Sequence, residues 1–152
     1  MKVLLAVDEL TFGMAIVEFV REHHWPEGTV FRVMNCIETV PAVANLAGVP
    51  VLLPEDVFDE SNDYAQRIVH EVTTRIRAMY PEHEVQTDVV RGNASYEILQ
   101  MAKEWPADLI LMGSHGRKGF TRFLMGSVSR DVVSNGPCSA VVIRLPVQES
   151  AA

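Results

Sequence analysis

Short apolar segments alternate with helical patterns along this 152-residue chain. The first segment, residues 3–7, is continuously apolar and ends in Asp8. A run of this kind is typical of a strand buried on both faces of a parallel sheet. Further strands are predicted at residues 30–37, 84–90, 108–112 and 140–143. The strand–helix alternation predicts one α/β domain over residues 1–146, with an open parallel five-stranded sheet and helices on both faces, followed by a loose tail at 147–152.

The predicted helices between these strands have apolar residues spaced three or four apart. Ser95 is expected to cap the third helix, and the fourth is expected at residues 127–134. Residues 39–54 carry no charge and are rich in proline, so they are predicted to form an ordered loop that can include a helical turn. The first three apolar stripes are formed by Phe12, Ala15, Ile16, Phe19 and Val20; by Tyr64, Ala65, Ile68, Val69, Val72, Ile76 and Met79; and by Ile98, Leu99 and Ala102.

The composition limits the kinds of partner that the protein can be expected to bind. Thirteen basic and twenty acidic residues give a formal charge of −7, which argues against binding to nucleic acid or to an anionic membrane. The two cysteines, Cys36 and Cys138, support neither a disulfide framework nor a Cys-rich zinc site. No apolar stretch approaches the roughly 20 residues of a membrane span. The expectation is a soluble protein of the reducing cytoplasm.

A glycine-bearing segment at residues 113–130 separates the fourth predicted strand from the last helix. Glycines let backbone amides approach an anion closely, and a helix that begins near Ser127 adds free N–H groups. The hydroxyls of Ser127 and Ser129 can donate further hydrogen bonds. The segment holds four basic residues and no acid, which gives +4, and the rest of the chain therefore carries −11. These features predict a phosphate cradle, although the charge by itself also fits a solvated loop.

The glycines and serine are spaced as Gly-x2-Gly-x9-Gly-Ser, at Gly113, Gly116, Gly126 and Ser127. This pattern is neither a Walker A loop nor the dinucleotide-binding Gly-x-Gly-x-x-Gly. Together with the segments at 92–94, 111–116, 124–129 and 136–138, it resembles the universal stress protein family, in the branch that binds ATP. The resemblance covers nearly the whole chain.

The resemblance implies a sheet of order 3-2-1-4-5 and a homodimer that pairs its last strands, here through Val141 and Ile143. It also implies that the loop holds the phosphates of ATP or AMP, with or without Mg²⁺. The aspartate after the first strand would lie near the nucleoside, and the backbone after the second strand would contact the adenine. The implied nucleotide-binding residues are Asp8, Cys36, Ile37, Gly113, Ser114, His115, Gly116, Arg117, Gly126, Ser127, Val128 and Ser129.

This sequence departs from the family pattern beside those residues. Glu9 and Leu10 follow the aspartate where many members have small residues, Asn35 stands where many have histidine, and Ser139 replaces a frequent proline. No base and nucleophile are arranged for catalysis, and no metal ligands stand at a suitable spacing. The leading hypothesis is therefore a nucleotide-responsive stress or regulatory protein with at most slow ATP hydrolysis. The alternative is a dimeric protein-interaction module that needs no nucleotide, and a true ATPase or nucleotidyl-transfer enzyme ranks last.

Overall fold

The main sheet is parallel and has five strands in the order β5-β2-β1-β6-β7. The computed structural model describes residues 1–38, 43–46, 49–52, 55–114 and 125–145. The sheet order is the 3-2-1-4-5 order expected from the sequence, because β5, β6 and β7 are its third, fourth and fifth strands along the chain. Its strands are β1 (Lys2–Ala6), β2 (Val30–Glu38), β5 (Glu84–Gly92), β6 (Leu109–Gly113) and β7 (Ser139–Ile143).

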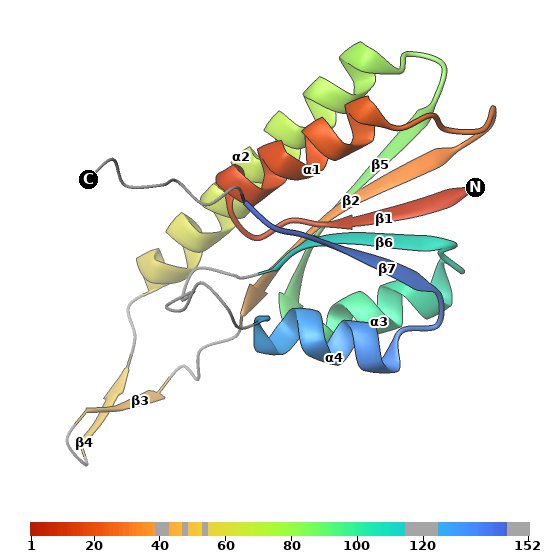
Figure 1. Cartoon of the computed structure of the whole chain (residues 1–152). Coiled ribbons are helices and arrows are strands. Elements are labelled where there is room, and N and C mark those ends of the chain that lie inside the picture. The colour runs from red at the N-terminus through yellow and green to blue at the C-terminus, as the bar shows by residue number, and fades with distance from the viewer. Residues whose placement is uncertain (39–42, 47–48, 53–54, 115–124, 146–152) are drawn as a thin grey trace, which may run out of the picture.

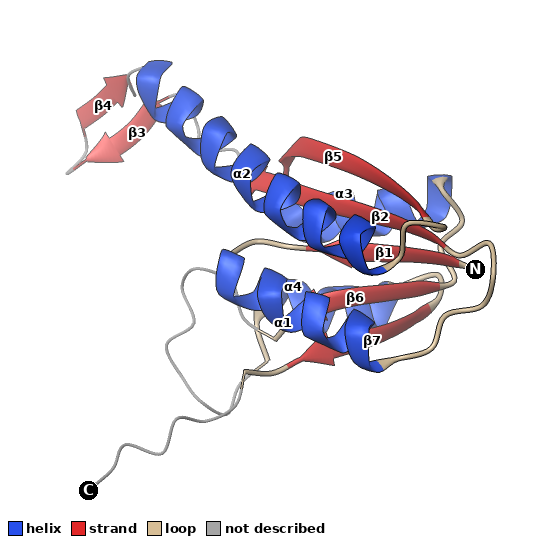
Figure 2. Ribbon diagram, turned by 90° about the horizontal axis from the view of Figure 1, so that it is seen from above, coloured by secondary structure: helices blue, strands red, loops and turns tan. Residues whose placement is uncertain are grey.

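Helices cover both faces of this sheet (Figures 1 and 2). One face carries α1 and α2, and the other carries α3 and α4. The helices change face because the strand order reverses at β1. The helices α1 and α2 connect β1 to β2 and β2 to β5, on one side of β1, whereas α4 connects β6 to β7 on the other side. Their bounds are α1 (Leu10–Glu22), α2 (Glu55–Met79), α3 (Ala94–Glu104) and α4 (Ser127–Asn135).

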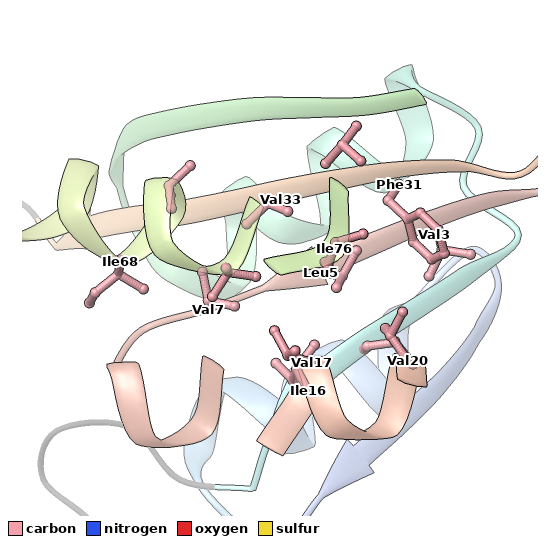
Figure 3. Close-up of a cluster of buried hydrophobic side chains, with 14 of the residues drawn as sticks. Val3, Leu5, Val7, Ile16, Val17, Val20, Phe31, Val33, Ile68 and Ile76 are labelled. Carbon is pink, nitrogen blue, oxygen red and sulfur yellow. The ribbon is translucent and has the colours of Figure 1, made fainter. Parts of the chain in front are cut away.

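Side chains of β1 contribute to a hydrophobic core on each face of the sheet. Val3 and Leu5 pack with residues of α1 and α2 (Figure 3), whereas Leu4 packs on the opposite face with Met34. Val3, Leu4 and Leu5 have no exposed surface. Successive strand residues point to opposite faces, so a strand buried on both sides must be continuously apolar. The prediction drawn from residues 3–7 is confirmed.

A second, two-stranded antiparallel sheet corrects the sequence prediction for residues 39–54. It consists of β3 (Val43–Leu46) and β4 (Val49–Leu52), where an ordered loop with a helical turn was expected. Figures 1 and 2 both show this hairpin beyond the first turn of α2, away from the main sheet.

The cap of α3 is a second correction. Ser95 was expected to cap this helix, but the N-cap residue is Asn93, whose Oδ1 accepts a hydrogen bond from the amide of Tyr96 at 3.1 Å. The hydroxyl of Ser95 instead donates to the same Oδ1 at 2.9 Å. Ser95 therefore supports the cap and lies inside the helix.

A partly buried ion pair crosses from β2 to β5 on the α3 side of the sheet. Arg32 donates to Asp88 through Nε at 2.6 Å and through Nη2 at 3.0 Å. The hydrogen bond that Arg32 donates to Asp88 is the main cause that raises the pKa of Arg32 above its usual value. The guanidinium also lies 5.5 Å from the centre of the Trp105 ring, within the range of a cation–π contact. No helix in the described part of the chain is both long and apolar enough to cross a membrane.

Candidate functional site

The carboxyl ends of β1, β2 and β6 meet at one edge of the main sheet. The pairing of β1 with β6 ends at Ala6 opposite Met112, and the pairing of β1 with β2 ends at Ala6 opposite Met34. The chain leaves β1 for α1 on one face and returns after β6 through α4 on the other face (Figure 1). In open α/β sheets a ligand crevice forms at this kind of reversal, beyond the carboxyl ends of the strands. Asp8 and Ser114 follow the two neighbouring strands at this point.

Two backbone hydrogen bonds fix the ends of the predicted phosphate loop, and one of them joins the two ends directly. The amide of Ser114 donates to the Ile143 carbonyl at 2.8 Å, and the amide of Gly126 donates to the Ser114 carbonyl at 2.8 Å. The glycine-bearing segment thus leaves β6 and enters α4 at nearly the same place. Three predicted site residues within it, His115, Gly116 and Arg117, lie outside the described residues, as do its other basic residues except Arg130.

The amino terminus of α4 opens at this edge. Gly126 is the N-cap residue, and no side chain caps the helix within the described part of the chain. The first intrahelical bond runs from the amide of Arg130 to the Gly126 carbonyl at 3.0 Å, so the amides of Ser127, Val128 and Ser129 precede the helical ladder. Such amides, together with the positive end of the helix dipole, form a ready anion site.

Ser127 and Ser129 play different parts in this turn. Ser127 is exposed, whereas Ser129 is buried and its hydroxyl donates to the Gly113 carbonyl at 2.8 Å. This hydrogen bond connects α4 to the carboxyl end of β6. Gly113 itself packs on α1, since a Cβ at this position would lie 2.7 Å from Cγ and Cδ1 of Phe12. Ser129 and Gly113 therefore hold the carboxyl end of β6 against α4 and α1.

The end of β2 presents Cys36 and Ile37 to different faces. Ile37 is buried, whereas Cys36 is half-buried on the side of β5, where its Sγ lies 3.7 Å from the Gly92 carbonyl oxygen. Because consecutive strand residues point in opposite directions, only one of the two side chains can line a given crevice. The structure therefore separates the two predicted adenine contacts at the level of their side chains, while the backbone of both remains at the same edge.

Carboxylates surround the thiol of Cys36. Burial, and after it the negative charges of Glu97, Glu38 and Asp8, raise the pKa of this thiol to about 11. A thiol in this environment stays protonated near neutral pH, so it is a poor nucleophile. Cys36 thus suits a packing contact with a ligand.

Asn35 is the site residue whose side-chain role was missed at the sequence level. Its side chain is 1% exposed, and its Nδ2 donates to the Val7 carbonyl at 2.7 Å. Its Oδ1 has no hydrogen-bond partner among the residues that the structure describes. The signal in the sequence was an amide at a strand position whose neighbours two residues away, Val33 and Ile37, are apolar.

The two ends of the candidate site carry opposite kinds of hydrogen-bonding group. Uncapped amides of α4 lie on the β6 side, and the carboxylate of Asp8 follows the neighbouring strand β1. An arrangement of this kind suits a ligand with an anionic group at one end and hydrogen-bond donors at the other. A five-stranded parallel sheet with helices on both faces and a glycine-bearing loop at its reversal defines a doubly wound, Rossmann-like α/β protein.

Comparison with known proteins gives the family. Residues 1–144 match the universal stress protein family, and the chain belongs to it. A universal stress protein of Methanocaldococcus jannaschii, MJ0531, is 37% identical over 65 residues, which cover 43% of this chain and 38% of that protein. The matched segment thus spans well under two thirds of that relative.

Solved structures share the fold at low sequence identity. The universal stress protein of Archaeoglobus fulgidus in complex with dAMP is 20% identical, with a TM-score of 0.65 over 94% of this chain and 97% of that one. A universal stress protein family protein of Arabidopsis thaliana with AMP bound is 14% identical, with a TM-score of 0.61 over 100% of this chain and 96% of that one.

Proposed function

We propose that this chain binds an adenine nucleotide, ATP or AMP, at the carboxyl edge of its main sheet and acts as a nucleotide-responsive stress or regulatory protein of the cytoplasm. Hydrolysis of ATP is at most slow. The single domain that carries this function extends over residues 1–146, and residues 147–152 form its tail.

The observation that carries the proposal is the uncapped amino terminus of α4 at the sheet reversal. It belongs to the segment of residues 113–130, which holds four basic residues and no acid, three of them before the helix and Arg130 in its first turns, in a chain that is otherwise strongly acidic. A phosphate there would accept hydrogen bonds from amides that have no helical partner and would meet the only strongly basic stretch of the sequence. We assign the phosphates to Gly113, Ser114, His115, Gly116, Arg117, Gly126, Ser127, Val128 and Ser129.

The other end of the nucleotide fits the opposite half of the site. The Asp8 carboxylate is a suitable acceptor for ribose hydroxyls. The backbone at Cys36 and Ile37 would contact the adenine, as the resemblance to the family implies. Two structural neighbours were solved with dAMP and AMP, which supports the adenine-nucleotide class. Asp8 and Glu9 are also the oxygen donors that Mg²⁺ prefers, so titrations with and without Mg²⁺ separate its contribution to ATP binding.

Isothermal titration of the purified protein with ATP and Mg²⁺ tests the proposal, and mass spectrometry of the purified protein reveals any retained nucleotide. Gly126→Asp places a carboxylate where the phosphate would sit and is expected to abolish binding. It should leave the fold intact, because aspartate is a favoured N-cap residue. Gly116→Glu is expected to abolish binding in the same way.

Gly28→Asp is the matched control. It adds the same charge at a turn where nothing lies within 4 Å of a Cβ, and at a φ of +74° that aspartate tolerates. It should bind as wild type does. No binding at millimolar ATP would refute the proposed function and favour the nucleotide-independent interaction module. Unchanged binding by both glycine variants would refute the placement of the phosphates. Turnover above about 1 s⁻¹ would instead identify an enzyme.

A homodimer through β7 is the second part of the proposal. This strand forms one edge of the sheet, and its residues Val141, Val142 and Ile143 are apolar and only partly buried. An open apolar edge invites pairing with another strand, and a twofold axis would pair two copies of β7. Sedimentation should show a dimer for wild type and a monomer for Val141→Lys. A wild type that sediments as a monomer at all concentrations would refute this part.

A further inference from the structure

The buried amide of Asn35 interrupts an otherwise apolar face of β2. Phe31 and Val33, which point to the same face of β2, have no exposed surface. Asn35 is itself 1% exposed and uses only part of its hydrogen-bonding capacity, because Nδ2 donates to the Val7 carbonyl while Oδ1 has no partner in the described part of the chain. An unpaired buried acceptor destabilises a fold. Stability alone therefore does not account for an amide at this position.

The bond that Asn35 does make fixes the backbone immediately before Asp8. Val7 is the first residue beyond the regular pairing of β1 with β2. Its amide donates to the Met34 carbonyl at 2.9 Å, and its carbonyl accepts from Asn35 at 2.7 Å. The Val7 carbonyl belongs to the same planar peptide unit as the Asp8 amide. Holding that carbonyl therefore sets the direction in which the Asp8 side chain leaves the end of the strand.

We infer that Asn35 is a positioning residue of the nucleotide site. It orients the Val7–Asp8 peptide so that the Asp8 carboxylate meets the ribose hydroxyls of the ligand. This inference rests on the proposed function. Asn35 acts through Asp8 and has no contact of its own with the nucleotide.

The replacement of Asn35 by leucine separates this role from a structural one. The variant exchanges the unpaired Oδ1 for an unpaired Val7 carbonyl, so the melting temperature should change little. The affinity for ATP should fall roughly two- to tenfold, the equivalent of one hydrogen bond. Asn35→His should recover the affinity, because Nδ1 of histidine occupies the same place along the side chain as Nδ2 of asparagine and can donate to the same carbonyl.

A double-mutant cycle with Asp8→Ala gives the decisive measurement. Titration with ATP should show that Asn35→Leu weakens binding in the wild-type background and has no further effect once Asp8 is alanine. If the leucine variant does not fold, Asn35→Thr replaces it, since its hydroxyl is one atom shorter and cannot reach the carbonyl. Equal effects in both backgrounds, or unchanged affinity in the folded variant, overturn the inference alone. A wild type that binds no adenine nucleotide overturns the proposed function as well.

Discussion

Gly113 provides a sharp test of how β6 packs against α1. A Cβ at this position would lie 2.7 Å from Cγ and Cδ1 of Phe12, whose side chain is buried. That separation is about 0.8 Å below the lower end of the roughly 3.5–4.0 Å range that suits two carbon atoms. Strand and helix must therefore move apart or the ring must leave its rotamer, and overpacking of this kind costs about 1–3 kcal/mol.

We expect Gly113→Ala to lower the melting temperature by roughly 2–12 °C, since 1 kcal/mol corresponds to about 2–4 °C in a chain of this size. Denaturant unfolding gives the free energy of unfolding directly. Phe12→Ala removes the two closest atoms and leaves only the Cβ of residue 12, at 3.1 Å from the added methyl, so Gly113→Ala should be much less destabilising in that background.

Gly28→Ala is the control for this cycle. Gly28 has a φ of +74° and nothing within 4 Å of a Cβ, so alanine there costs about 1–2 kcal/mol through the backbone alone. That cost should be the same with or without the Phe12 ring. If Gly113→Ala is equally destabilising in both Phe12 backgrounds, the steric reasoning is wrong.

Three further predictions concern other features of the fold. Asn93→Ala removes the α3 cap and should cost about 0.5–2 kcal/mol in urea unfolding, whereas Ser95→Ala, which keeps the cap, should cost less. Cys36, with a pKa of about 11, should react with iodoacetamide at pH 8 roughly a hundredfold more slowly than an ordinary thiol. The rate of this reaction should rise as the pH approaches 11, and peptide mapping of the labelled protein measures it. Arg32→Met should cost about 1.5–3 kcal/mol, because it leaves the partly buried Asp88 without its charged donor, and a rescue of stability by Asp88→Leu in the same chain would confirm the cause.

The main sheet was predictable because its strands carry their signal locally. The run from Val3 to Val7 is apolar at every position, and only burial on both faces accommodates that. The β3–β4 hairpin carried no such signal. Pro50 and Gly48 indicate a loop when read alone, yet both strands of a two-stranded sheet are edges, where proline is tolerated opposite Asn45. The pairing of each strand with its partner decides the structure here, and the local sequence does not show that pairing.

The cap of α3 and the hydrogen bond from Asn35 to the Val7 carbonyl were not predicted, for related reasons. Asn93 and Ser95 are both good caps, and the choice depends on where β5 ends, which the local sequence does not fix. The bond from Asn35 to Val7 joins residues 28 positions apart along the chain, so it follows from strand order and register. The glycine spacing of residues 113–126 could be recognised as a motif, but the hydrogen bond from the Ser129 hydroxyl to the Gly113 carbonyl depends on how α4 packs against β6, which the local sequence does not fix.

The central position of β1 has a consequence for the order in which the protein can be made. This strand is synthesised before the other four strands of the main sheet, and it pairs with β2 once residues near Val30 have emerged from the ribosome. Its other edge pairs with β6, and the bond from Lys2 to Asp108 spans 106 residues. Until that late segment has emerged, one edge of this buried strand has no partner, which is the condition under which nascent chains associate with one another. Ribosome-bound chains from which residue 109 has not emerged should therefore depend on chaperones, and those from which residue 113 has emerged should depend on them less.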